Sequence, residues 1–244
     1  MHPDEYRKLA ETEDRMWYSR ALNRRGLHWL DQLSTPGMRR VLDAGCGTGG
    51  FTRYVQAVGR PWEITGLDFS GQACALARER TTARIVQGSI LELPFGDAEF
   101  DAIAALDVIC QVDDGGRAVS ELVRCVRPGG AVLINVPAYR WLWSYHDDQC
   151  ETKHRYTRGE LRARCIAAGL RVEFATYVNF ATLPLLIGRR KIFRPRSPTS
   201  DVRLYPAPVE AVLRGVTWIE HAWTRRGWRL PAGSSVFVAA RKAG

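Results

Sequence analysis

Val41-Leu42-Asp43-Ala44-Gly45-Cys46-Gly47-Thr48-Gly49-Gly50 is the stretch that decides the fold of this chain. An apolar strand runs directly into a glycine-rich loop, and an aspartate stands just before the first glycine. Glycine lets the backbone turn tightly and approach a ligand closely, and the helix that follows presents unpaired N–H groups at the same place. The stretch therefore predicts a strand–loop–helix unit that binds a nucleotide cofactor.

The spacing of the glycines leaves two kinds of cofactor open. Gly45, Gly47 and Gly50 satisfy the G-x-G-x-x-G pattern of dinucleotide sites, and Asp68 stands where either cofactor would place its ribose-binding acid. Asp43 separates the two, because a carboxylate beside the pyrophosphate of a dinucleotide would be repelled. S-adenosylmethionine carries a sulfonium and an ammonium group and no phosphate, so Asp43 favours it. An NAD(P)-dependent oxidoreductase and a non-catalytic S-adenosylmethionine-binding protein remain the alternatives.

Further motifs follow the glycine loop in a recognisable order, and with them the chain resembles the class I S-adenosylmethionine-dependent methyltransferases. The segments that carry the resemblance are 41–49, 64–70, 86–95, 100–108 and 126–134. Two positions depart from the family pattern. Ser89 replaces an acid that often meets the adenine amino group, and Cys110-Gln111 stands where relatives often carry Glu-His. Neither change removes the cofactor site.

The charge argument and the resemblance together give an expected set of cofactor contacts. These lie in the glycine loop and just after the strands: Asp43, Gly45, Gly47, Gly49, Asp68, Phe69, Ser89, Ile90 and Asp107. The glycines would cradle the methionine part, Asp68 the ribose hydroxyls, Phe69 and residues 89–90 the adenine, and Asp107 the space beneath the sulfonium. In related enzymes an aromatic N-terminal helix folds over the cofactor, which implies further contacts from Trp17 and Arg20.

Alternating apolar strands and helical segments predict an α/β fold. We expect strands near 40–44, 62–68, 84–87, 100–105, 131–136 and 170–178, and helices near 4–33, 49–58, 70–80, 115–127, 157–168 and 209–223. The resemblance makes 235–240 a seventh, antiparallel strand. The expected architecture is a Rossmann-like, doubly wound, mostly parallel sheet in a single domain, 1–244. It carries an N-terminal helical cap over 1–36 and a lid-like insertion over 179–233.

The segment after the fifth expected strand is rich in aromatic and titratable residues, and we assign the acceptor site to it. Its aromatic rings predict a flat apolar wall made by Tyr139, Trp143 and Tyr156. A hydroxyl acceptor gains from a base, for which His146 and His154 are the candidates, although either ring could instead bind loop backbone. We therefore expect methyl transfer to an oxygen, with nitrogen second, on a natural product, sugar or lipid-linked metabolite. The spacing of the His, Asp, Cys and Glu side chains over 146–154 matches no strong metal motif, so no metal is expected.

Charge and composition restrict the partners. The net charge is +9, and part of it falls in a basic run of the insertion: Arg189, Arg190, Lys191, Arg194 and Arg196. No recognisable RNA-binding module accompanies it, so nucleic acid is disfavoured, and a water-facing basic surface is preferred over contact with a membrane. The sequence leaves open whether the protein forms a homodimer. The charged start of the chain is no secretory signal, no apolar run reaches membrane-helix length, and the six cysteines show no C-x-x-C spacing. We expect a cytoplasmic location with reduced cysteines.

Overall fold

The glycine loop lies at the centre of a seven-stranded sheet, which the computed structural model describes together with its helices over residues 3–192 and 200–243. The elements follow in this order: α1 (Pro3–Thr12), α2 (Trp17–Leu33), β1 (Arg40–Ala44), α3 (Gly50–Ala57), β2 (Glu63–Asp68), α4 (Gly71–Arg80), β3 (Arg84–Gln87), β4 (Phe100–Leu106), η1 (Ile109–Gln111), α5 (Gly115–Cys125), β5 (Val126–Pro137), η2 (Arg140–Leu142), α6 (Tyr145–Gln149), α7 (Arg158–Ala167), β6 (Leu170–Val178), α8 (Leu183–Ile187), η3 (Gly188–Ile192), α9 (Ala207–Thr224) and β7 (Ser235–Lys242).

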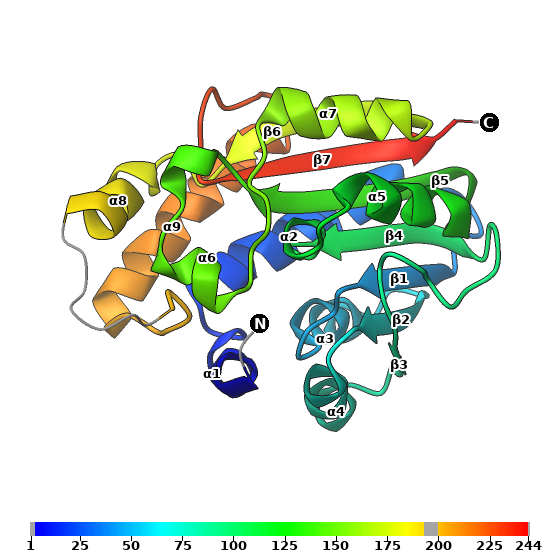
Figure 1. Cartoon of the computed structure of the whole chain (residues 1–244), viewed down its shortest axis with the longest axis horizontal. Helices are drawn as coiled ribbons and strands as arrows, with labels where there is room; N and C mark the ends of the chain where they lie inside the picture. Colours follow the sequence, from blue (N-terminus) through cyan, green and yellow to red (C-terminus); the bar gives the residue numbers. More distant parts are fainter. Residues whose placement is uncertain (1–2, 193–199, 244) are drawn as a thin grey trace.

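The strands are ordered β3-β2-β1-β4-β5-β7-β6 across the sheet (Figure 1). β1 to β5 pair in parallel, and β7 runs antiparallel to both of its neighbours. The strand order reverses between β1 and β4, where an open sheet of this kind leaves a crevice at the carboxyl ends of its strands. The expected Rossmann-like sheet with an antiparallel last strand is confirmed.

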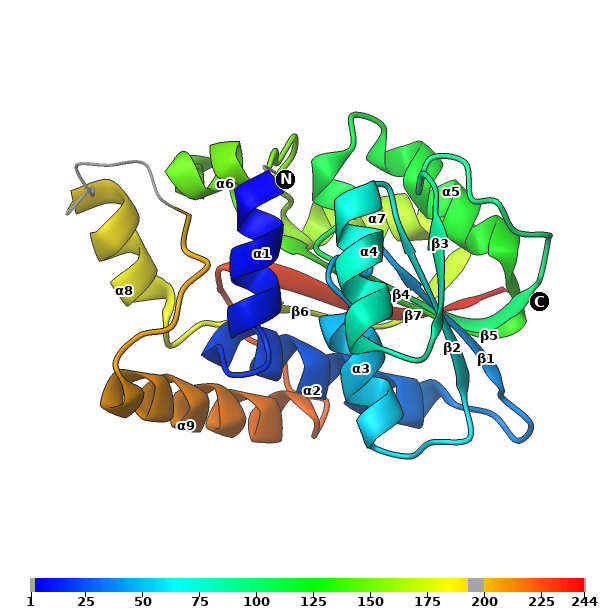
Figure 2. The same cartoon turned by 90° about the horizontal axis from the view of Figure 1, so that it is seen from below.

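Helices cover both faces of the sheet (Figure 2). α2 and α3 pack on one face through a core that includes Leu30, Phe51 and Leu133. α5 and α7 pack on the other face through a second core that includes Leu122 and Leu161. The central strands are buried on both faces and read as nearly continuous apolar runs, which is the pattern of a covered parallel sheet.

The N-terminal region expected as helix from 4 to 33 is divided in two. Met16 is extended, with φ −64° and ψ 130°, and it separates α1 from α2. The Trp17 backbone N–H, at the start of α2, donates to the Glu210 carboxylate of α9 at 2.9 Å. Because of this break, α1 lies beside α4 (Figure 2). There α1 covers the glycine loop, with its Leu9 side chain next to Gly47.

The segment between β6 and β7 contains more structure than the sequence indicated. The expected helix near 209–223 corresponds to α9, but α8 and the π-helical turn η3 were not predicted. Arg189, Arg190 and Lys191 of the basic run lie in η3, whereas Arg194 and Arg196 fall outside the described residues. Within the described part of the chain, every helix is too short or too polar to cross a bilayer.

α9 is fixed to α2 and to the end of β6 by a buried charge. The Glu220 carboxylate accepts the backbone N–H groups of Asn179 and Phe180 at 2.5 and 2.8 Å. It also lies 3.7 Å from the Arg25 guanidinium, and both side chains are almost fully buried. Arg25 belongs to α2, so this single carboxylate connects three elements of the wall that borders the site described below.

We predict that Glu220→Ala lowers the free energy of unfolding by about 3–5 kcal/mol, because the buried Arg25 cation is left without its partner charge. Urea unfolding followed by circular dichroism measures the change. Glu79→Ala, which removes an exposed glutamate of α4, is the control and should shift the free energy by less than about 0.5 kcal/mol. Equal stability of the two variants would show that the Glu220 carboxylate does not hold α9 in place.

Candidate cofactor and acceptor site

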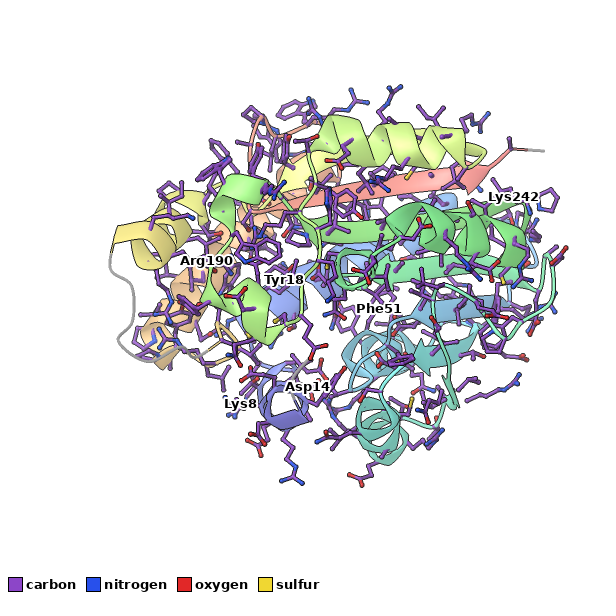
Figure 3. The ribbon with its side chains drawn as sticks, viewed as in Figure 1. Lys8, Asp14, Tyr18, Phe51, Arg190 and Lys242 are labelled. Carbon is purple, nitrogen blue, oxygen red and sulfur yellow. The ribbon has the colours of Figure 1, made fainter. Side chains whose placement is uncertain are left out.

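A cavity of about 300 Å³ opens beyond the carboxyl ends of β1, β2, β4 and β5. Its walls come from the strand ends with the glycine loop, from the two N-terminal helices, and from the segments 146–155, 182–190, 201–213 and 234–235. Charged and titratable side chains line it in unusual number: Glu13, Tyr18, Asp43, Asp68, Asp107, His146, Asp147, Arg155, Arg189, Arg190 and Asp201. Figure 3 shows Tyr18 near the middle of this region, with Phe51 toward the sheet and Arg190 on the side of α8.

The glycine loop forms the floor of the cavity at the end of β1. Gly45 and Gly47 line the cavity and have positive φ angles of 80° and 53°. A Cβ at Gly45 would lie 2.4 Å from the Val108 side chain, so the glycine is required by packing as well as by its backbone angle. Gly49, at φ 85°, is the N-cap residue of α3, faces Thr81 and Ala77, and is not part of the cavity lining.

Three aspartates reach the cavity from the ends of neighbouring strands. Asp43 accepts a hydrogen bond from the Thr52 hydroxyl at 2.7 Å. Asp68 accepts the backbone N–H groups of Gly47 and Ser70, each at 2.9 Å. Among the described residues, neither aspartate forms an ion pair with an arginine or lysine. Within the described residues, both carboxylates are held by neutral hydrogen-bond donors.

Asp107 is the third aspartate, and it follows β4 in a left-handed conformation with φ 63°. It accepts the Tyr18 hydroxyl and the Asn135 side-chain amide, both at 2.7 Å. Tyr18 comes from α2, so the N-terminal cap contributes directly to the polar floor of the cavity. Like the other two aspartates, Asp107 has no cationic partner within salt-bridge distance in the part of the chain that is described.

Burial raises the pKa of all three carboxyl groups. Desolvation is the largest cause in each case, and it raises the pKa of Asp43 to about 7. Hydrogen bonds from Thr52, from the loop backbone and from Tyr18 oppose this rise but do not cancel it. A cation entering the cavity would stabilise the ionised carboxylates, whereas an anion would meet three groups that repel it. The donor set fits a ligand with positive charge and no phosphate.

α1 closes the cavity above the glycine loop. Glu13, just after this helix, is buried, accepts the Thr48 hydroxyl at 2.5 Å and pairs with Arg80 of α4. Tyr6 of α1 also lines the cavity, and burial, followed by the nearby charge of Asp68, raises its pKa to about 12. The sequence did not single out either residue, because only the break between α1 and α2 brings them over the loop.

The expected adenine side is open in this structure. Phe69 is 78% exposed and lies outside the cavity lining. Ile90 is buried in the core against the sheet, and the Ser89 hydroxyl accepts the backbone N–H of Leu91 at 3.1 Å. Neither residue lines the cavity. The structure thus brings together the methionine and ribose ends of the expected cofactor site, but not the residues expected at its adenine.

The two N-terminal residues expected at the cofactor are separated by the helix that carries them. Trp17 lines the cavity and packs edge-on against Tyr18, with ring centroids 5.8 Å apart. Arg20 is exposed and is not part of the cavity lining. One turn of α2 therefore presents its aromatic side chains to the site and its arginine to solvent.

His146 is the histidine that lies at the cavity. It is partly buried, and its Nδ1 accepts the backbone N–H of Asp201 at 3.2 Å. Burial and the nearby Arg190 charge lower its pKa to about 4, so the ring is neutral near pH 7. With Nδ1 used as an acceptor, the neutral ring carries its proton on Nε2 and offers a hydrogen-bond donor.

Two sets of charged side chains lie near His146, and they differ in net charge. Arg155 and Asp147 form a fully buried bidentate pair, with N–O distances of 2.7 and 3.0 Å. Arg189 and Arg190 share the single carboxylate of Asp201, with contacts between 2.7 and 3.1 Å. These interactions lower the pKa of Asp201 to about 2 against the effect of its burial. One pair is neutral, and the other set leaves a net positive charge at this end of the cavity.

The other residues expected at the acceptor lie away from the cavity lining. His154 is 42% exposed at its side chain and binds Glu160 at 2.7 Å. Tyr156 is buried in the core, and Tyr139 is stacked on Trp141 and Tyr177. The fourth residue, Trp143, donates from its indole to Asp148. In the described ranges, no three His, Cys, Asp or Glu side chains are gathered closely enough to hold a metal ion.

Comparison with known proteins finds methyltransferases that are similar to part of this chain. Residues 42–134 match the model of a methyltransferase domain. Malonyl-[acyl-carrier protein] O-methyltransferase of Enterobacter lignolyticus is 36% identical over 143 residues, which are 56% of this chain and 55% of that protein. Demethylmenaquinone methyltransferase of Staphylococcus aureus is 32% identical over 51% of each chain. The chain thus matches about half the length of these curated relatives.

A solved structure extends the likeness over the whole fold. The SAM-dependent methyltransferase of Thermotoga maritima, described as a possible histamine N-methyltransferase, superposes with a TM-score of 0.61. The match covers 98% of this chain and 95% of that one at 18% sequence identity. Residues 42–134 thus match a methyltransferase domain, and the chain as a whole shares its fold with a solved S-adenosylmethionine-dependent methyltransferase.

Proposed function

We propose that this protein transfers the methyl group of S-adenosylmethionine to an oxygen atom of a small molecule. The observation that carries the proposal is a set of three aspartates, the buried Asp43 and the partly buried Asp68 and Asp107. They line one cavity and form no ion pair with a described arginine or lysine. A sulfonium and an ammonium group supply the missing positive charge. The relatives named above act on small molecules or carrier-bound acyl groups, which supports the same class of reaction.

The proposed cofactor contacts follow from the cavity lining. Gly45 and Gly47 cradle the methionine part beside Asp43, Asp68 binds the ribose hydroxyls, and Asp107 lies beneath the sulfonium. Tyr18 and Asn135 fix the Asp107 carboxylate in that position. Phe69 lies beside Asp68 on the exposed flank, where an adenine ring could stack on it. We assign no contact to Ile90, which is buried in the core.

The main task of the protein in this reaction is to position the two reactants. When it is bound, the cofactor supplies a methyl group that is already activated by a positive sulfur atom. The chain has to hold the acceptor atom in line with that methyl group and to exclude water. Residues of α1 line the cavity on one side, and Arg190 and Asp201 line it on the other.

The acceptor end of the cavity favours an oxygen that is already negatively charged. Arg189 and Arg190 outnumber their one carboxylate, Asp201, and His146 presents an N–H donor beside them. Such a site attracts a carboxylate and repels an ammonium group. A carboxylate oxygen needs no base, whereas a hydroxyl acceptor would need His146 in its other tautomer. We therefore rank a carboxylate ahead of a hydroxyl, and both ahead of an amine.

The test of this proposal is methyl transfer from labelled S-adenosylmethionine to matched acids, alcohols and amines on aliphatic and aromatic skeletons. We expect methyl ester formation from an acid to exceed transfer to the alcohol or amine of the same skeleton. Preferred transfer to the amine would contradict the acceptor assignment. Binding of the cofactor without transfer to any skeleton would support the non-catalytic alternative instead.

The same assay distinguishes the two roles open to His146. If the ring donates a hydrogen bond to the acceptor, His146→Gln keeps activity within about fivefold, and His146→Ala loses roughly 10- to 100-fold. If the ring is a general base, both variants lose about 100-fold or more. We predict the first pattern, together with a rate that does not rise as pH passes through 6.5. His154→Ala is the control, and a large loss there would return the base assignment to His154.

Asp43 makes cofactor affinity depend on pH. Its pKa in the free protein is raised to about 7 by burial, so below pH 7 the carboxyl is mostly neutral and must lose a proton to pair with a cation. Affinity for S-adenosylmethionine should rise with pH, about tenfold from pH 6 to pH 8, and level off above that. Isothermal titration of the wild type and Asp43→Asn measures this. A flat profile in the wild type, or the same slope in the variant, would contradict the assignment, and Asp97→Asn, an exposed change, serves as the control.

A further inference from the structure

α9 carries mostly polar side chains on its buried side and large apolar side chains on its exposed side. Its buried side chains are mostly polar: Glu210, Leu213, Thr217, Glu220, His221 and Thr224. Its large exposed side chains are apolar: Val209, Val212, Trp218, Ile219 and Trp223. Val212 and Ile219 are each 64% exposed. A helix on the surface of a water-soluble protein normally turns its apolar stripe inward, so this reversal requires an explanation.

The polar inner face has a clear structural use. Glu210 accepts the backbone N–H groups of Trp17 and Tyr205, at 2.9 and 3.1 Å. Glu220 accepts two more at the end of β6, and Thr217 bonds the helix backbone. These contacts fix α9 on α2, as Figure 2 shows, and leave the opposite side of α9 facing away from the rest of the molecule. Because Glu210, Glu220 and Thr217 all have partners on the inner side, the apolar outer face does not result from a helix that is turned the wrong way.

We call Val209, Val212, Trp218, Ile219, Trp223 and Trp228 the outer α9 surface. Trp228 follows the helix, is half exposed and packs on Trp223 with ring centroids 4.1 Å apart. Tryptophan is favoured where one side of a residue is apolar and the other is wet, as at a membrane interface. An exposed apolar surface of this extent marks a contact with another molecule.

The charge around the outer α9 surface limits what that molecule can be. Between residues 202 and 230 the cationic side chains are all arginines: Arg203, Arg214, Arg225, Arg226 and Arg229. The acids in the same span are Glu210 and Glu220, and both are buried on the inner side. The exposed side of this span therefore carries positive charge without any carboxylate. A second copy of the chain would bring two such faces together and would be repelled.

We propose that the outer α9 surface docks on an anionic lipid bilayer. Its tryptophan, isoleucine and valine side chains would enter the boundary between headgroups and acyl chains, with the arginines on lipid phosphates. Leu213, on the inner side of the same helix, lines the cavity, so only the thickness of α9 separates the bilayer surface from the site. The docking rests on α9 alone and does not depend on the reaction proposed above.

Cosedimentation of the full chain with phosphatidylcholine vesicles, with and without 30% phosphatidylglycerol, tests the proposal. We expect binding to the anionic vesicles that weakens in 0.5 M salt and exceeds binding to neutral vesicles at least tenfold. The double variant Val212→Ser/Ile219→Ser should bind the anionic vesicles at least about tenfold more weakly than the wild type, because two apolar side chains are removed from the contact. Ile166→Ser, which removes an exposed isoleucine of α7, is the matched control and should bind like the wild type.

Unfolding curves and S-adenosylmethionine titration of both variants verify that the fold is intact, since the changed side chains lie outside the cavity. Absence of vesicle binding by the wild type would overturn the proposal. Equal binding by the double variant and the wild type would overturn it too. Light scattering provides a further outcome: a wild-type dimer that the double variant abolishes would make the occupant a second copy of the chain, and not a bilayer.

Discussion

The site depends on three carboxylates at the ends of adjacent strands, one of them buried and two partly buried. Taking a carboxylate out of water is costly unless a cation or hydrogen-bond donors replace the water. Asp43, Asp68 and Asp107 have donors, but no arginine or lysine within salt-bridge distance in the part of the chain described. Their raised pKa values record the remaining cost. A cationic ligand lowers this cost, and that is why we assign the site to S-adenosylmethionine.

The cavity is polarised from one end to the other. The carboxylates lie at the strand ends, and the excess guanidinium charge of Arg189 and Arg190 lies toward α8. The neutral pair of Arg155 and Asp147 also lines the cavity. Arg155 donates to the Ala138 carbonyl just after β5, so the pair connects α6, which carries Asp147, to the end of that strand. This arrangement orients a cationic methyl donor and an anionic acceptor toward each other by charge alone.

The sequence predicted those features that depend on local pattern and on strand order. The glycine loop and the aspartates after β1, β2 and β4 were predicted together, because carboxyl ends of parallel strands meet at one edge. Pairings between distant segments could not be predicted, such as Tyr18 with Asp107 or Arg190 with Asp201. Adjacency to a strand end also does not fix the direction of a side chain. For this reason Phe69 and Ile90 were expected in the pocket but lie on the surface and in the core.

The most direct measurement of the central claim is a side-by-side isothermal titration of the wild-type protein with S-adenosylmethionine and with NADH. Both ligands carry an adenosine, but one is a cation without phosphate and the other bears a pyrophosphate. The account predicts saturable binding of S-adenosylmethionine at one site and no measurable binding of NADH. Binding of NADH without binding of S-adenosylmethionine would contradict it.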